Sequence, residues 1–300
     1  MKIVMIGHSS AGKTTYVSLM YDTMRVGMEG FSLRAAEAYD HRVLKKAARA
    51  IRKGRYPDPS NQRSSFNLVL QHNGSDVFPF TWRDYRGGAL SERSVDSEQA
   101  KELYEDLRES DAIVVFADAQ RLATRRGAAL ENATLVTHVM RALADRDGAV
   151  LPVLVVFTKW DLVAHLGEEA QERIAAPFRQ LIEAIDRSES AIGLAVPVAC
   201  GPEPVNVAVP VLACLWVGLL SRINTLTALV QEHAESADRL AAQDTVVDRF
   251  TSWWKGESSY AQLAEERRRS ALAELSRLEP LVEPAERLQE LLDQVLDAAG

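Results

Sequence analysis

The stretch that decides the fold is Lys2-Ile3-Val4-Met5-Ile6, followed by Gly7-His8-Ser9-Ser10-Ala11-Gly12-Lys13-Thr14-Thr15. The first part is an apolar run typical of a buried strand. The second part fits the phosphate-loop pattern G-x-x-x-x-G-K-[ST] at every fixed position. In that pattern the glycines let backbone N–H groups turn toward a phosphate chain, Lys13 brings positive charge to the β- and γ-phosphates, and Thr14 offers a hydroxyl to Mg²⁺. Residues 7–15 therefore predict a site for nucleotide phosphates.

The composition narrows the class of protein. The chain has 300 residues, 47% of them apolar, which is enough for one α/β domain and a smaller appendage. Its formal charge of −7 argues against a general nucleic-acid binder, so we expect no nucleic-acid partner. Cys200 and Cys214 lie in apolar surroundings without metal-ligand spacing, as in a reducing compartment. Because the first strand begins at residue 2, we expect no signal peptide and a cytoplasmic protein.

The rest of the chain alternates apolar runs with stretches of helical spacing. Strands are expected near residues 112–117, 153–157 and 194–199, and a hairpin over 66–82 turns at Asn73-Gly74. Helices are expected near 13–24, 33–53, 97–109, 128–144 and 168–187, and from 208 onward. This alternation predicts an α/β fold with a doubly wound, mainly parallel sheet, to which the hairpin adds one antiparallel edge.

An acidic residue ends the hairpin's second strand, in Asp84-Tyr85-Arg86-Gly87-Gly88. A carboxylate at the C-terminal end of a strand, on the sheet edge that carries the phosphate loop, can hold Mg²⁺. Gly87 could offer its N–H group to a γ-phosphate. Asp84 therefore predicts a metal ligand.

A second polar motif, Thr158-Lys159-Trp160-Asp161, directly follows the strand that ends at Phe157. The Asp161 carboxylate can accept two hydrogen bonds from the ring N–H and the amine of guanine, whereas adenine presents the opposite polarity. The stem of Lys159 can pack along the base and ribose. Alternatively, Asp161 is only the N-cap of a helix. The position behind the phosphate loop and Asp84 favours guanine.

The ordered set of residues 7–14, 84–87 and 158–161 resembles the translation-factor-and-Ras-like class of P-loop GTPases over about residues 1–225. The resemblance implies that Asp84 reaches Mg²⁺ through water and that Thr158, Lys159 and Asp161 read guanine. The family's fifth motif lines up loosely with Ala199-Cys200-Gly201, where a backbone N–H group would contact guanine O6. The arrangement looks most like bacterial GTPase modules of signalling or conflict-system proteins.

Two positions depart from the family pattern. The loop before the hairpin has no Thr to complete the Mg²⁺ site, so Ser60 is the expected metal ligand, with Ser64 as the alternative. The position of the water-orienting Gln is Gly88, so another group would supply catalysis. The candidates for this catalytic group are Arg63 and Arg86, with Arg55 as a further one, because an arginine of these loops could stabilise the charge of the transition state. Alternatively, hydrolysis is slow or activated by a partner.

Ser10-Ala11-Gly12-Lys13 also looks like the phosphate loop of dynamin-type GTPases, in which the Ser helps position a monovalent cation. That resemblance implies hydrolysis activated by dimerisation, with Lys13 and Ser10 as catalytic residues and a homodimer as one state of the chain.

Residues 226–300 are expected to form a helical arm beyond a GTPase domain of residues 1–225. Apolar residues recur at 4-3 spacing from Leu219 to Leu240, and further amphipathic helices are expected over 260–278 and after Pro284. The arm would form a hairpin within the chain or bind a protein effector. Trp253-Trp254 lies among mixed charges, so we expect no membrane association.

Together these features predict a protein that binds GTP with Mg²⁺, hydrolyses it to GDP and acts as a nucleotide-dependent switch. The alternatives are a guanine-nucleotide-dependent scaffold with little or no hydrolysis, and a dynamin-like GTPase activated by dimerisation.

Overall fold

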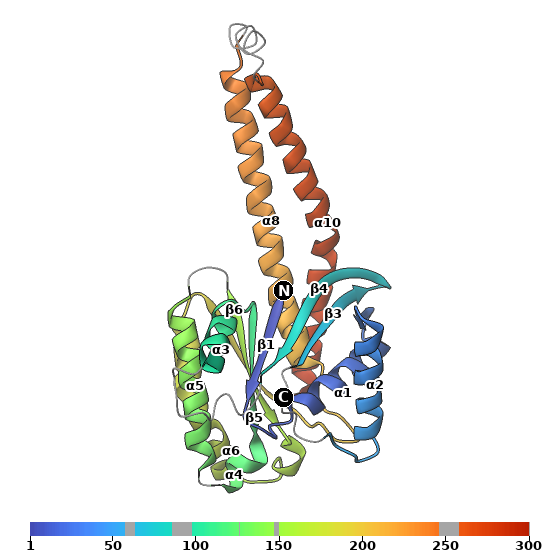
Figure 1. Ribbon diagram of the computed structural model, residues 1–300, viewed down its shortest axis with the longest axis vertical. Helices are drawn as coiled ribbons and strands as arrows, with labels where there is room; N and C mark the ends of the chain where they lie inside the picture. The colour runs from blue at the N-terminus through green and yellow to red at the C-terminus, as the bar shows by residue number, and fades with distance from the viewer. Residues whose placement is uncertain (58–63, 86–97, 126, 147–149, 246–257, 300) are drawn as a thin grey trace. The chain divides into compact units, whose positions relative to one another are not determined.

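The computed structural model describes residues 1–57, 64–85, 98–125, 127–146, 150–245 and 258–299 of the chain (Figure 1). In this part of the chain one sheet has the strand order β2-β3-β4-β1-β5-β6-β7. Its strands are β1 (Lys2–Gly7), β2 (Phe31–Ala35), β3 (Ser64–His72), β4 (Ser75–Asp84), β5 (Ala112–Asp118), β6 (Leu151–Thr158) and β7 (Ala191–Pro197).

Strands β4, β1, β5, β6 and β7 run parallel to one another, whereas β2 and β3 are antiparallel to their neighbours. The helices are α1 (Lys13–Val26), α2 (Ala38–Ile51), α3 (Glu98–Arg108), α4 (Ala119–Thr124), α5 (Ala128–Ala144), α6 (Glu168–Ala175), α7 (Arg179–Asp186), α8 (Val209–Gln243) and α10 (Tyr260–Ala299), with 3-10 turns η1 (Trp160–Leu162) and η2 (Ala176–Phe178). The predicted α/β fold with a C-terminal helical extension is confirmed.

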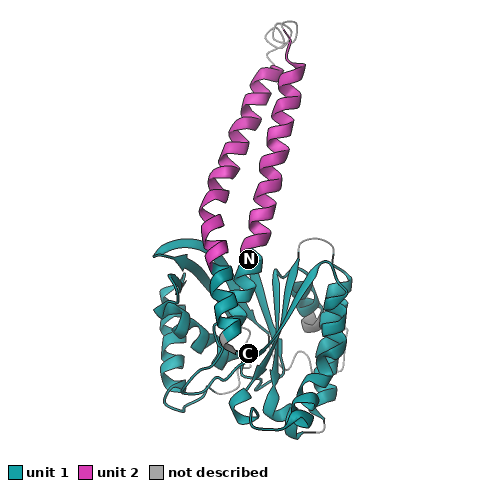
Figure 2. Ribbon diagram, turned by 180° about the vertical axis from the view of Figure 1, so that it is seen from behind, with its two compact units in different colours: residues 1–218, 288–300 teal, residues 219–287 magenta. Residues whose placement is uncertain are grey.

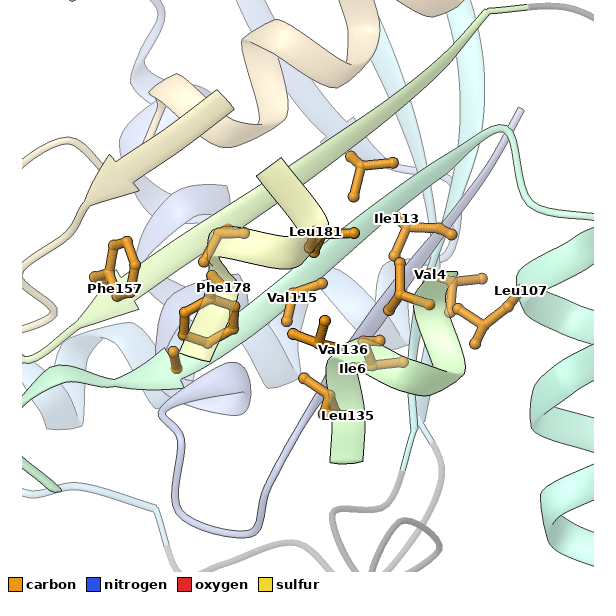
Figure 3. Packing of buried hydrophobic residues seen from close by; sticks show 14 of the residues in the cluster. Val4, Ile6, Leu107, Ile113, Val115, Leu135, Val136, Phe157, Phe178 and Leu181 are labelled. Atoms are coloured by element: carbon orange, nitrogen blue, oxygen red, sulfur yellow. The ribbon is translucent and has the colours of Figure 1, made fainter. Parts of the chain in front are cut away.

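The two faces of the sheet are covered by different helices. Because successive strand residues point to opposite faces, Ile113 and Val115 of β5 face α3, α5, η2 and α7, and Figure 3 shows their cluster with Leu107 and Phe178. On the opposite face, the ring of Tyr16 from α1 lies 5.0 Å from the ring of Phe116. The central parallel strands are therefore buried on both sides, and this explains their continuous apolar runs.

An ion-pair triad joins two strands to a helix in the first layer. The Asp106 carboxylate on α3 accepts hydrogen bonds from Lys2 Nζ of β1 at 2.8 Å and from Arg83 Nη1 of β4 at 2.7 Å. Burial opposes ionisation of Asp106, but these two donors outweigh it and lower the pKa of the carboxyl. The triad ties α3 to strands β1 and β4 of the sheet.

Four elements differ from the expectation. Residues 31–35 form the edge strand β2, so the helix expected from residue 33 begins only at Ala38. Burial of Phe31 and Leu33 against β3 outweighs the local helical spacing. Pro177 divides the helix expected over 168–187 into α6 and α7, because proline lacks the N–H group that continues a helix. The short helix α4 was not expected.

The fourth difference is in the C-terminal arm, where Pro280 and Pro284 lie inside the single helix α10 rather than between two helices. Each proline removes one backbone hydrogen bond. The helix nevertheless continues because burial of Leu281 and Ala285 holds this stretch in register.

The chain divides into two compact units, residues 1–218 with 288–300, and residues 219–287 (Figure 2). The second unit consists of parts of α8 and α10 that lie side by side, with Arg268 Nη2 3.9 Å from Asp238 Oδ1 and with Leu226 and Ala264 buried. Here α8 and α10 pack within the chain. The expected boundary at residue 225 differs from the limits of these two units, and the division into a domain of residues 1–225 and an arm of residues 226–300 stays a prediction.

Helix α8 is, among the described residues, the one helix long and apolar enough to cross a membrane. However, 61% of its apolar window is buried inside the structure, as in a core helix.

Candidate nucleotide site

Several of the predicted site residues meet at one edge of the sheet. Gly7 ends β1, Asp84 ends β4 and Thr158 ends β6, and these strands are parallel. Asp118 ends β5, between β1 and β6, and pairs in register with Thr158. The C-terminal ends of parallel strands form the edge at which ligands bind in open α/β sheets.

The phosphate loop turns sharply between β1 and α1. The Ala11 N–H group donates to His8 O at 3.1 Å, and Ser10 and Gly12 have φ values of 66° and 85°. A Cβ atom on Gly7 would lie 2.6 Å from Phe116 O, so only glycine fits beside β5 at this point. The Ser9 and Ser10 side chains are exposed at the crest of the loop.

Lys13 points back across the loop that precedes it. Its Nζ donates to Gly7 O at 2.8 Å and to His8 O at 3.4 Å, and the residue is only 8% exposed. Burial lowers the pKa of Lys13, although Asp84 opposes that shift. No side chain caps the N-terminus of α1 at Gly12. The first-turn N–H groups of α1, which have no intrahelical partner, are therefore open to an anion.

Asp84 is buried without a hydrogen bond to its Oδ1 atom among the described residues. It is 5% exposed, and its Oδ1 lies 3.8 Å from Lys13 Nζ. Burial raises the pKa of Asp84 to about 6, although the Lys13 ammonium opposes this shift. The Lys13 ammonium lies beyond hydrogen-bond distance of Oδ1, so a cation bound closer to this oxygen would satisfy it. With the hydroxyl of Thr14 at the start of α1, the oxygen donors present fit a magnesium ion.

Thr158 links residues 158–161, which are predicted to read guanine and are called the guanine-reading motif below, to the phosphate loop. Its hydroxyl lies 2.9 Å from Ala11 O and 3.2 Å from Ala117 O, and the residue is 1% exposed. One hydroxyl proton thus holds the end of β6 against the phosphate loop, which follows β1.

Lys159 adopts a left-handed backbone conformation, with φ 57°, and its Nζ forms an ion pair with Asp118 Oδ2. The other Asp118 oxygen, Oδ1, accepts from the Arg121 N–H group at 2.9 Å and caps α4. Sequence reasoning missed Asp118. The signal was present, because an acidic residue ends a buried strand at the same sheet edge as Asp84.

Asp161 lies in η1 with its side chain exposed. Lys159, not Asp161, occupies the N-cap position of that turn, and no side-chain capping bond forms. The alternative role of Asp161 as an N-cap is therefore wrong. Burial, with the nearby Asp161 carboxylate, raises the pKa of Cys200 to about 12, so the structure brings these two predicted residues together.

The loop after β7 is tied to the guanine-reading motif by the Trp160 N–H group, which donates to Val198 O at 3.2 Å. The Ala199 N–H group donates to Val205 O at 3.2 Å. The Ala199 amide is thus engaged within the chain, and the contact of the segment Ala199-Cys200-Gly201 with guanine O6 stays a prediction.

The remaining predicted residues are not placed. Ser60, Arg63, Arg86 and Gly87 lie outside the described residues, as does Gly88. Ser64 begins β3, but its side chain is outside the described part. Arg55 is exposed beyond the end of α2.

Three solved structures resemble this chain at low sequence identity. The signal recognition particle receptor SRb-GTP/SRX complex from Chaetomium thermophilum gives a TM-score of 0.41 at 16% identity, covering 66% of this chain and 90% of that one. The small COPII coat GTPase SAR1 from Encephalitozoon cuniculi, in complex with GDP, gives a TM-score of 0.34 at 14% identity. The match covers 65% of this chain and 68% of that one. The S. cerevisiae Ski7 GTPase-like domain, bound to GDP and inorganic phosphate, gives a TM-score of 0.37 at 12% identity. The match covers 66% of this chain and 43% of that one.

A comparison with curated proteins found no match. Residues 4–152 match a family model described as Double-GTPase 1, which takes in β1 to the beginning of β6, and with them the phosphate loop and Asp84. The match covers just under half of the chain. Together with the phosphate loop and the sheet, it confirms the resemblance to P-loop GTPases, and residues 4–152 are similar to the Double-GTPase 1 family.

Proposed function

We propose that this protein binds GTP with Mg²⁺, hydrolyses it to GDP and uses the difference between the two states as a molecular switch. The observation that carries the proposal is the buried Asp84 carboxylate, with one oxygen unsatisfied and 3.8 Å from Lys13 Nζ. A purely structural carboxylate at that depth would be hydrogen-bonded. Its position at the end of β4 suits a cation that accompanies phosphates on the neighbouring loop.

Each residue has a separate role in this proposal. The Lys13 ammonium and the open N–H groups of α1 bind the β- and γ-phosphates. Thr14 and Asp84 hold Mg²⁺, with Ser60 as the proposed further ligand. Bound there, the ion would neutralise charge that develops on the phosphates. Asp161 accepts from guanine, and Thr158 and Asp118 keep the motif and Lys159 in place.

The test is multiple-turnover release of inorganic phosphate from GTP and from ATP. Wild type should favour GTP, because Asp161 would face an acceptor on adenine. Lys13→Ala should reduce release by about 100-fold or more, and Asp161→Asn should remove the preference for GTP. Lys101→Ala and Asp186→Asn, at exposed positions on α3 and α7, serve as matched controls.

Three results would overturn parts of the proposal. Equal use of ATP and GTP by wild type would remove the guanine assignment. Release that survives Lys13→Ala would remove the enzyme assignment. Tight GTP binding without release would leave the guanine-nucleotide-dependent scaffold as the function.

Activation by a second copy, suggested by the exposed Ser10, also has a direct test. Specific activity should rise with protein concentration if two copies complete the site, and activity independent of concentration would exclude this mode. We further propose that a protein effector binds to the switch loops or to α8 and α10. The proposed location of the protein is the cytoplasm.

A further inference from the structure

Helix α2 carries a stripe of positive charge on its exposed side. Basic residues recur at helical spacing, while Leu44, Ala48 and Ile51 are buried on the opposite side. The stripe consists of Arg42, Lys45, Lys46 and Arg49, continued by Lys53 beyond the helix. Residues 41–57 contain no Asp or Glu, in a chain whose net charge is −7.

The chain then folds back along this stripe and forms a groove. Gly54 has φ 71°, which favours glycine, and the Arg55 N–H group donates to Ala50 O at 3.0 Å. The returning segment adds Arg55, Tyr56 and Pro57 to the lining. The small side chains of Ala47 and Ala50 leave room between the two walls, and the cavity has a volume of about 630 Å³.

The basic side chains of this groove are unpaired in the described part of the chain. The neighbouring Arg52 forms an ion pair with Asp22 at 3.2 Å, but no ion pair is formed there by the stripe or by Arg55. Like charges three or four residues apart on a helix repel one another. A bound polyanion would relieve this repulsion.

We infer that the groove along α2 is a second binding site, which takes a small, soluble, multiply phosphorylated ligand. Its volume is within the range of small-molecule sites. Arginine and lysine are the side chains that bind phosphate groups. A membrane or a nucleic-acid duplex would extend past the groove and face an otherwise acidic chain. A compact anion would meet the basic side chains among the described lining residues.

Tyr56 indicates where a non-phosphate part of such a ligand would lie. The residue is 57% exposed at the edge of the groove. An aromatic ring there offers a face on which a nucleobase can stack. A nucleoside polyphosphate would use both features, whereas an inositol polyphosphate would use the charges alone.

The test uses the full chain and inorganic tripolyphosphate, titrated by calorimetry. All proteins in the titration carry Lys13→Ala, which weakens binding of tripolyphosphate at the phosphate loop. Binding measured at the groove is therefore independent of the proposed GTPase activity. We expect one bound tripolyphosphate and an affinity about ten-fold lower in Lys46→Gln/Arg49→Gln. The matched double variant Lys101→Gln/Arg187→Gln, with exposed positions on α3 and after α7, should bind as tightly as the background.

The inference is overturned if tripolyphosphate does not bind, or if the control pair weakens it as much as the groove pair does. Unfolding in urea shows that the groove variants remain folded. If ATP competes with tripolyphosphate and Tyr56→Ala abolishes this competition, the ligand is a nucleoside polyphosphate. If inositol hexakisphosphate competes with tripolyphosphate and Tyr56→Ala leaves this competition intact, the ligand is an inositol polyphosphate. If the protein sediments with phosphatidylserine vesicles but does not bind tripolyphosphate, the groove binds membranes and the inference of a soluble ligand is refuted.

Discussion

The hydroxyl of Thr158 gives the sharpest test of how the guanine-reading motif and the phosphate loop are held together. It lies 2.9 Å from Ala11 O and 3.2 Å from Ala117 O in a position that is 1% exposed. Thr158→Val keeps the shape of the side chain and removes only the donor. Thr158→Ser keeps the donor and removes only a methyl group.

The structure sets the size of each effect. A buried carbonyl that loses its donor destabilises the fold by about 1–3 kcal/mol. Because the hydroxyl has one proton to donate at a time, we expect Thr158→Val to lower the free energy of unfolding by about 2 kcal/mol. Thr158→Ser loses one buried methyl group, worth about 1 kcal/mol. Only the Val variant frees Ala11, so only there should GDP affinity fall, by about ten-fold, or 1.4 kcal/mol.

Urea unfolding followed by tryptophan fluorescence measures the stabilities, and titration with a fluorescent GDP analogue measures the affinities. If Thr158→Val is as stable as Thr158→Ser and binds GDP as tightly as wild type, the hydroxyl does not position the phosphate loop.

Three further predictions concern ionisable side chains. Asp118→Asn should keep the cap of α4 but lose the ion pair to Lys159. GDP affinity should therefore fall about three- to ten-fold, while the free energy of unfolding falls by less than about 1 kcal/mol. Unchanged GDP affinity would count against a role of Asp118 in positioning Lys159. Asp106→Asn should destabilise the fold by about 1–2 kcal/mol at neutral pH, since solvent screens partners that are about one quarter exposed. Because the pKa of Asp106 is lowered from 3.8, this difference should be complete above pH 3.8 and should disappear as the pH falls through the lowered value, as measured by urea unfolding across that range. Burial raises the pKa of Cys200 above that of a free thiol, so its alkylation by iodoacetamide at pH 8 should be at least about ten-fold slower than that of a free thiol, and rapid labelling of the folded chain would contradict this.

The sequence by itself determined the α/β architecture and which residues lie together at the candidate nucleotide site. The phosphate loop, Asp84 and the motif from Thr158 to Asp161 could be recognised because each depends on a few neighbouring residues and on the end of an apolar strand. Parallel strands then bring those ends to one edge of the sheet whatever the details of packing.

Only the tertiary structure decided which groups contact one another across the chain. The Thr158 hydroxyl meets Ala11 O across 147 positions and the Lys159 ammonium meets Asp118 across 41, distances at which local spacing carries no information. The same holds where packing overrode local propensity. Residues 31–35 become strand β2 because β3 offers them a partner, and α10 continues through Pro280 where buried contacts compensate for a missing hydrogen bond. Contacts made by folding, rather than preferences of neighbouring residues, determine these features.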